Sequence, residues 1–243
     1  MKTKNCAIIV AAGKGTRMKA PQPKQFMALT SHPILWHTAK PFIQCKDIHE
    51  IIFAVPEIYI ETCQREVIHS LCETLQVNDK NRSCLRCVKG GARRQDSVFA
   101  GLTELENTTD IVVIHDGVRP FVTPLQISRY VELAKEKKAV IPGIPPQETV
   151  KKVDEDGAIN HTIDRSQIQM AQTPQAFSYE LIKRAYDFGI QNSLTVTDDA
   201  MLVEKMGEKV YIDQGHPLNI KITTPEDLIL AEKICQIWPP DNL

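Results

Sequence analysis

The sequence predicts an α/β fold in which a mainly parallel sheet is flanked by helices. Short apolar runs of strand length alternate with longer segments whose apolar residues recur at helical spacing, and this alternation is typical of βαβ units. The 243 residues are 42% hydrophobic and 24% charged, which is enough for a full core, and α/β domains of about 200 to 250 residues are common. We therefore expect a single Rossmann-like domain over residues 1–243.

The expected strands are short apolar runs, and the expected helices carry apolar residues three or four positions apart. The strands cover residues 7–10, 50–55, 84–89, 110–114, 139–144 and 208–212, and a further apolar strand contains Lys221. The helices cover residues 33–45, 57–75, 93–105, 124–138 and 179–190, and two more begin near Thr197 and Pro225. Ligands of open sheets collect at the carboxyl ends of the strands, so the residues after each strand are the candidates for function.

Residues 145–167 differ from the rest of the chain. Apolar and polar residues alternate there, and Asp156-Gly157 is a hairpin turn signal. A polar two-stranded ribbon is marginally stable by itself in water, so it needs a surface to pack against. We expect residues 145–167 to form a protruding β-hairpin arm that reaches a partner subunit.

Composition excludes several classes of protein. The formal net charge is −1, so the chain is not a general polyanion binder, and we expect no nucleic acid partner. Neither a membrane-spanning apolar run nor a signal peptide is visible, which predicts a cytoplasmic protein. The seven cysteines fit reduced thiols better than a disulfide framework, and the lone pair Cys84 and Cys87 favours plain thiols over a zinc or redox site.

The stretch after the first strand, AAGKGTRM followed by PKQF, indicates phosphate binding. Small residues let backbone N–H groups approach an anion, and Arg17 and Lys24 add full charges. An ordinary strand-to-helix turn is the alternative. Met18 stands where a dinucleotide fingerprint needs its third glycine, and a P-loop pattern is absent.

Two later strands end in similar candidates. GGARRQDSV opens a helix whose first turn offers unpaired N–H groups, although a plain N-cap with solvated arginines explains it equally well. HDGVRPF places Asp116 where one carboxylate could hold Mg²⁺, and Arg119 could bind a phosphate through its fork of donors. Alternatively, Asp116 caps the next turn and pairs with Arg119. Lys221, in an apolar strand, needs an anionic partner.

Taken together and in this order, AAGKGTRM, PKQF, GGARRQDSV, HDGVRPF, TPQAF and NIKITTPEDL resemble the cytidylyltransferase branch of the sugar-nucleotide pyrophosphorylase superfamily. The resemblance implies a homodimer joined through the 145–167 arm, with CTP and a phosphorylated polyol as substrates. Its implied nucleotide-binding residues are Ala11, Ala12, Gly13, Gly15, Arg17, Lys24, Gly90, Gly91, Arg94, Ser97 and Asp116. Its implied acceptor-binding residues are Arg119, Thr149, Arg165, Thr173, Thr197 and Lys221. Ala92 departs from the acidic residue expected there.

These residues suit transfer chemistry that depends on positioning and charge neutralisation. We expect the acceptor phosphate to attack the α-phosphorus of CTP directly, with Arg17, Lys24, Arg165 and Lys221 as the catalytic cations. A phosphate acceptor is already ionised, so His115 is not needed as a base. For Thr197, an N-cap with Asp198 and Asp199 behind it is an alternative to a substrate contact.

The sequence leaves alternatives open for the acceptor substrate and for the functional class of the protein. The branch members most similar to this chain act on methylerythritol 4-phosphate, and ribitol 5-phosphate is the runner-up acceptor. An NAD-type dehydrogenase would need a third glycine in the first loop and an acidic residue ending the second strand, which ends in Val55-Pro56. A non-catalytic nucleotide-binding module would not need Lys221 or Arg165.

Overall fold

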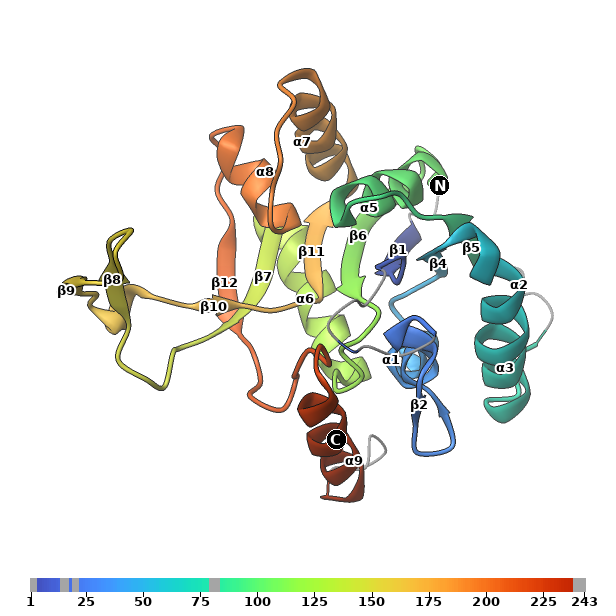
Figure 1. The fold of residues 1–243 in the computed structure, drawn as a ribbon. Coiled ribbons are helices and arrows are strands. Elements are labelled where there is room, and N and C mark those ends of the chain that lie inside the picture. The colour runs from blue at the N-terminus through green and yellow to red at the C-terminus, as the bar shows by residue number, and fades with distance from the viewer. Residues whose placement is uncertain (1–3, 14–17, 19–21, 79–83, 238–243) are drawn as a thin grey trace.

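The computed structural model describes residues 4–13, 18, 22–78 and 84–237. Gly15 and Arg17 lie outside the described residues, so the structure says nothing of the roles that the sequence assigns to them. The described residues form an eight-stranded sheet with helices on both faces (Figure 1).

The sheet is mixed but mainly parallel, as the sequence predicts. Its order is β10-β7-β11-β6-β1-β4-β5, and β12 pairs with β7. The pairs β1 with β4, β1 with β6, β4 with β5 and β7 with β12 are parallel. The strands are β1 (Lys4–Val10), β4 (Glu50–Val55), β5 (Leu85–Lys89), β6 (Thr109–Asp116), β7 (Ala139–Ile144), β10 (Met170–Ala171), β11 (Gln175–Ser178) and β12 (Tyr211–Gln214).

Sequence analysis did not predict β10 and β11, which are antiparallel to their neighbours. β11 lies between β6 and β7, where Ala176 is opposite both Val113 and Val140. Its short sequence, QAFS, follows directly on polar residues and Pro174. That context is typical of a loop, because neighbouring strands, not local propensity, stabilise a strand of this kind.

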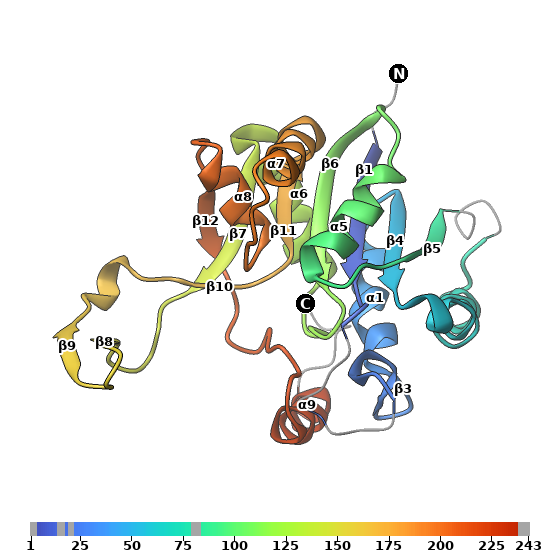
Figure 2. The ribbon, with the colours of Figure 1, turned by 45° about the horizontal axis from the view of Figure 1, so that its top comes forward.

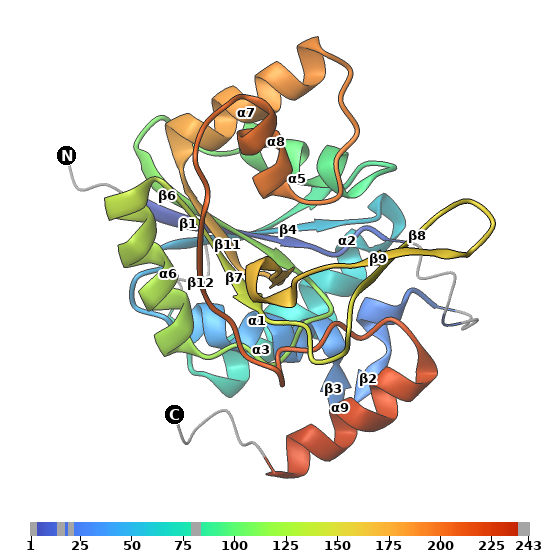
Figure 3. The ribbon, with the colours of Figure 1, turned by 90° about the vertical axis from the view of Figure 1, so that its left-hand side faces the viewer.

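The helices divide into two layers (Figure 3). α1, η4, α3 and α6 cover one face of the sheet, and α5, α7 and α8 cover the other. α9 packs beside the short β2–β3 hairpin. The bounds are β2 (Ala28–Leu29), β3 (His32–Pro33), α1 (Ile34–Gln44), α2 (Ile60–Thr62), η4 (Cys63–His69), α3 (Ser70–Thr74), α5 (Arg94–Thr103), α6 (Pro124–Lys137), α7 (Tyr179–Gln191), α8 (Asp199–Lys205) and α9 (Pro225–Ile237), with the short turns η2 (Lys24–Phe26), η3 (Glu57–Tyr59) and η5 (Arg165–Gln167).

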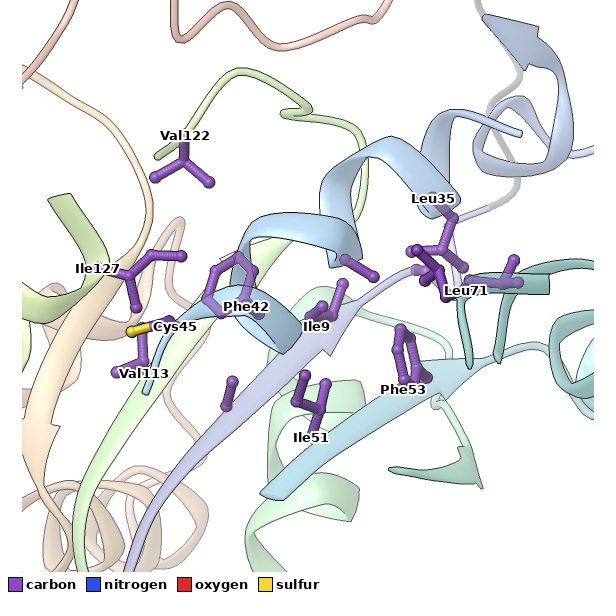
Figure 4. Close-up of a cluster of buried hydrophobic side chains, with 14 of the residues drawn as sticks. Ile9, Leu35, Phe42, Cys45, Ile51, Phe53, Leu71, Val113, Val122 and Ile127 are labelled. Atoms are coloured by element: carbon purple, nitrogen blue, oxygen red, sulfur yellow. The ribbon is translucent and has the colours of Figure 1, made fainter. Parts of the chain in front are cut away.

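Alternate residues of the central strands pack into the two layers. Ile9 of β1 and Phe53 of β4 point into the same buried cluster as Phe42 and Leu71 (Figure 4). Ile8, one position away, packs into the opposite cluster beneath α5 and α7. Strands buried on both faces are rigid, and they hold the loops at their carboxyl ends in place.

Residues 145–167 contain the expected hairpin. β8 (Lys151–Val153) and β9 (Ile159–Thr162) pair in antiparallel fashion, and Gly157 adopts a φ of +83° in the turn. The hairpin projects away from the sheet in two views (Figures 1 and 2), and its residues are exposed. Whether it joins two subunits remains a prediction.

Two local predictions were wrong. Lys221 does not lie in a strand, since residues 219–223 form an extended segment that Ile222 N anchors to the carbonyl of Val118 at 2.9 Å. Thr197 is not the N-cap of α8. Asp198 has that role, because its backbone is extended and its carboxylate accepts from Met201 N at 3.1 Å.

Candidate active site

A cleft of about 240 Å³ opens at the carboxyl ends of β1 and β6. It gathers residues from loops that are far apart in the sequence. The residues assigned from the sequence that line it are Ala11, Ala12, Gly13, Lys24, Gly91, Arg94, Ser97, Asp116 and Lys221. The described part of the small-residue loop, the two lysines and Asp116 therefore lie around one cleft, and the roles assigned to them stay predictions.

Backbone hydrogen bonds hold the first loop against its neighbours. Ala11 N donates to the carbonyl of Ala54 at 2.8 Å, and Gly117 N donates to that of Val10 at 2.8 Å. The side-chain amide of Gln25, which is buried, donates through Nε2 to the carbonyl of Ala11. Sequence analysis missed Gln25, although its place beside Lys24 in PKQF was a usable signal.

The second loop packs closely against the first. A Cβ atom at Gly90 would lie 2.3 Å from that of Ala12, so only glycine permits this approach. Ser97 is buried and accepts from Gly91 N at 3.1 Å, which closes the turn before α5. Gly90 and Ser97 thus shape the backbone of the cleft.

Asp116, at the end of β6, is the centre of charge. Its Oδ1 accepts from Nε of Arg94 at 2.9 Å, and its Oδ2 lies 2.7 Å from Nζ of Lys221 and 3.6 Å from Nε of Arg119. Burial by itself would raise the pKa of Asp116. The charges of Arg94, Lys221 and Arg119 outweigh burial and hold that pKa well below its ordinary value. Asp116 is therefore ionised at neutral pH.

Lys24 and Lys221 lie on the same side of the cleft. Lys24 Nζ donates to the carbonyl of Ile222 at 3.0 Å, one residue beyond Lys221. Both lysines also line the cleft. The described charged side chains that line the cleft are Lys24, Arg93, Arg94, Lys221 and Asp116, so positive charge is in surplus there, although the whole chain is nearly neutral. This surplus suits a phosphorylated ligand.

A second hollow of about 450 Å³ adjoins the first and shares Ala12, Gly91 and Ala92 with it. Tyr59 and Pro56 line its far side. Its walls are mostly backbone and small or apolar side chains, a surface that suits a flat, uncharged base. Ala92 presents no carboxylate to either hollow.

A sequence model of the family 2-C-methyl-D-erythritol 4-phosphate cytidylyltransferase matches residues 5–236. The chain belongs to this family. Among curated proteins, the 2-C-methyl-D-erythritol 4-phosphate cytidylyltransferase of Clostridium beijerinckii is 45% identical over 226 residues, 93% of this chain and 96% of the relative. That of Clostridium botulinum is 42% identical over the same shares.

Solved structures of family members are similar in fold. The crystal structure of 4-diphosphocytidyl-2C-methyl-D-erythritol synthase from Anaerococcus prevotii aligns with a TM-score of 0.82 at 33% identity, covering 96% of each chain. That of 2-C-methyl-D-erythritol 4-phosphate cytidylyltransferase from Francisella tularensis aligns with a TM-score of 0.76 at 30% identity, covering 95% of this chain and 99% of the other.

Arg119 lies next to Asp116, the pairing that sequence analysis gave as the alternative to phosphate binding. Its side chain is mostly buried, and Nη1 donates to the carbonyl of Asn219 at 2.7 Å while Nε approaches Asp116. The pairing of Arg119 with Asp116 is thus present. A contact of Arg119 with an acceptor phosphate stays a prediction.

One short segment, residues 172–175, hydrogen-bonds the end of β6, the segment before Lys221 and the start of α8. Sequence analysis assigned a role only to Thr173 in this segment. Thr173 Oγ1 accepts from Asp116 N at 3.1 Å. Gln172 hydrogen-bonds His216 and Asn219, which precede Lys221. Gln175 donates to Asp198 at 2.8 Å and accepts from Asp199 N. Gln175 belongs to the TPQAF motif, but sequence analysis assigned no role to Gln172 or Gln175, because their partners lie in segments distant along the chain.

His115 is fully buried beside Asp116. Its Nε2 lies 2.9 Å from the carbonyl of Arg119, and its Nδ1 lies 2.9 Å from Oγ1 of Thr173. Burial lowers the pKa of His115 to about 4, so the ring is neutral at physiological pH. A neutral, buried and doubly hydrogen-bonded imidazole orders the loop, and the expectation that the reaction needs no base stays a prediction.

Thr149, Arg165 and Thr197 do not line the cleft of their own chain. All three are exposed, and Arg165 Nη1 donates to the carbonyl of Gln147 at 2.6 Å within the arm region. None of the seven cysteines, all of which the structure describes, is in a disulfide, and the thiols of Cys87 and Cys63 interact. No helix among the described residues is long and apolar enough to cross a membrane.

The donor set around Asp116 allows only one kind of metal site. Within the described residues no group of three or more acidic, histidine or cysteine side chains could hold an ion. Mg²⁺, however, requires few protein ligands when phosphates and waters supply the rest. The Lys221 side chain beside Asp116 is 38% exposed and is free to move aside toward solvent. The site therefore fits an ion that arrives with a phosphorylated nucleotide.

Proposed function

We propose that this chain transfers the cytidylyl group of CTP to 2-C-methyl-D-erythritol 4-phosphate. The products are 4-diphosphocytidyl-2-C-methyl-D-erythritol and pyrophosphate, a step in isoprenoid precursor synthesis. Membership of the family supports the reaction and the two substrates. The observation that carries the proposal is the meeting of Lys24, Lys221, Arg94 and Asp116 at one cleft.

The reaction needs an ionised nucleophile, which the acceptor phosphate already is. One of its oxygens forms a bond to the α-phosphorus of CTP, the bond from that phosphorus to the bridging oxygen breaks, and pyrophosphate leaves. In this proposal Lys24 stabilises the charge that develops on the phosphates, and Lys221 orients the acceptor phosphate. Arg17, outside the described residues, is proposed to share the role of Lys24.

The nucleotide is proposed to lie across both hollows. The mostly apolar hollow between Tyr59 and Ala92 suits the base, and the backbone of Ala11, Ala12 and Gly13 suits the triphosphate. Asp116 would hold Mg²⁺, which supplies charge neutralisation at the phosphates when it is bound. Gly90 lines the second hollow and Ser97 lines the first. Between them they are proposed to contact the ribose of the nucleotide.

We also propose that two chains form a homodimer through the arm. Val153 and Ile159 are opposite each other on the hairpin and are 53% and 64% exposed. Thr149 and Arg165 lie at the base of the same arm, away from their own cleft, so a partner's cleft is the place where they could contact an acceptor. Cysteines outside disulfides and phosphorylated substrates are consistent with the proposed cytoplasmic location.

Parallel assays test the proposal. Purified protein with CTP and Mg²⁺ is offered 2-C-methyl-D-erythritol 4-phosphate or ribitol 5-phosphate, and pyrophosphate release is measured. We expect release with the first acceptor and at most slow release with the second. Preference for ribitol 5-phosphate would overturn the acceptor assignment, and the absence of release with either would overturn the function.

A further inference from the structure

Asp199 is a buried acid that the proposed reaction does not use. Its side chain has no exposed surface, although it belongs to the first turn of α8. Its neighbour Asp198 already caps that helix by accepting from Met201 N. A buried carboxylate costs several kcal/mol in lost hydration unless charges and hydrogen bonds compensate. Helix capping therefore does not account for Asp199.

Of the residues that contact Asp199, Arg94 lines the cleft, whereas Tyr186 and Gln175 do not. Oδ2 of Asp199 is 2.8 Å from Nη1 of Arg94, and Oδ1 accepts from the hydroxyl of Tyr186 at 2.6 Å. Gln175 accepts from Asp199 N and Ala200 N at 3.2 Å each, which holds the backbone of this turn. Tyr186 and Gln175 thus fix the position of Asp199, and its second carboxylate oxygen, Oδ2, faces Arg94.

Arg94 is consequently held at two edges of its guanidinium. Nε donates to Asp116, and Nη1 faces Asp199. Its third nitrogen, Nη2, is buried and has no hydrogen-bond partner among the described groups, while the side chain lines the cleft. Among the cations that the structure describes, only Arg94 touches both buried acids, Asp116 and Asp199. A guanidinium is planar, so two fixed edges determine the direction of the third.

We propose that Asp199, supported by Tyr186, is a positioning residue for nucleotide binding. It holds the plane of Arg94 so that Nη2 can donate to an oxygen of the nucleotide in the cleft. A buried donor without a partner is costly, and a ligand oxygen removes that cost when it binds. The inference rests on the proposed function, because it requires that the cleft binds CTP.

The test compares three variants with the wild type, by calorimetric titration of CTP with Mg²⁺ and by steady-state kinetics. Asp199→Asn keeps the size but loses the charge, and we expect CTP affinity to fall about tenfold, as for loss of a charge-assisted hydrogen bond. KM for the acceptor should stay unchanged. Tyr186→Phe should weaken CTP binding in the same direction by about threefold, as for a neutral hydrogen bond. Asp198→Asn is the matched control, since asparagine also caps helices, and it should bind CTP as the wild type does.

A double-mutant cycle separates positioning from a general loss of structure. If Asp199 acts through Arg94, then Asp199→Asn should change CTP affinity little in an Arg94→Lys background. Additive losses, equal effects of Asp199→Asn and Asp198→Asn, or a CTP affinity of Tyr186→Phe equal to that of the wild type would each overturn the inference. Melting temperatures identify variants that do not fold. Failure of the wild type to bind CTP would instead overturn the proposed function, so the two failures are distinguishable.

Discussion

Nζ of Lys221 lies 2.7 Å from Oδ2 of Asp116. The lysine comes from the segment before α9 and the carboxylate from the end of β6, so this ion pair spans the cleft between two distant parts of the chain. The pair also places Lys221 where an acceptor phosphate can replace the carboxylate as its partner. Asp116 would keep Arg94 and Arg119 as partners if Lys221 moved.

Lys221→Ala should lower kcat by about 10² to 10³, as removal of one preorganised donor does in other enzymes. The fold should persist, because Asp116 stays paired with two arginines. Pyrophosphate release and thermal unfolding are the measurements. Lys209→Ala, at an exposed lysine, is the control and should match the wild type. An undiminished rate in Lys221→Ala would exclude the proposed role.

Stability should depend on pH through buried histidines. His115 and His37 both have a pKa lowered to about 4 by burial, against 6.5 when unperturbed. Between those values the unfolded chain binds more protons, so the free energy of unfolding should rise as pH rises from about 4 to 6.5 and then level off. Each histidine contributes up to about 3 kcal/mol to this rise.

Urea unfolding of the metal-free protein at several pH values measures this dependence. His115→Gln should remove about half of the histidine contribution, because His37 supplies the other half with the same sign. His161→Gln, on the exposed hairpin, should leave the slope unchanged. A wild-type slope that survives in His115→Gln without reduction would contradict the assignment.

Gly90→Ala should weaken CTP binding by about tenfold, since overpacking of this kind costs about 1 to 3 kcal/mol. The added Cβ would lie 2.3 Å from that of Ala12 and would push the first loop out of place. The double variant Gly90→Ala with Ala12→Gly removes that contact and should regain most of the affinity. Calorimetric titration of CTP measures both. No recovery in the double variant would show that the contact with Ala12 is not the cause.

Ile159→Asp should convert the proposed dimer into a monomer and lower activity with it. A charge on this exposed apolar side chain of the arm would have to be buried against the partner, which is costly. Light scattering coupled to size-exclusion chromatography gives the mass, and pyrophosphate release gives the activity. Asn160→Asp adds the same charge one residue away and is the control. A monomeric and fully active wild type would refute the role of the arm.

Local patterns predicted much of the fold. Apolar runs identified β1, β4 and β6, and the Asp156-Gly157 turn identified the hairpin, since these signals depend on residues adjacent in sequence. The small-residue loop and the carboxylate after β6 were also found, because parallel strands place their ends at one edge. β11 was missed because neighbouring strands stabilise it. Gln172 and Gln175 were missed because their hydrogen-bond partners lie in distant segments, and Gln25 was missed despite its place in PKQF.

The sequence by itself determined that an α/β sheet with a phosphate-type loop, several cations and one carboxylate at strand ends would form, and its ordered motifs indicated the family. Only the tertiary structure decided that Asp199 holds Arg94 while Asp198 caps the helix, and that Lys221 pairs with Asp116 from an extended segment. The reason is physical: hydrophobic periodicity is written in neighbouring residues, whereas the energy of a buried charge depends on which distant groups the fold brings within about 3 Å of it.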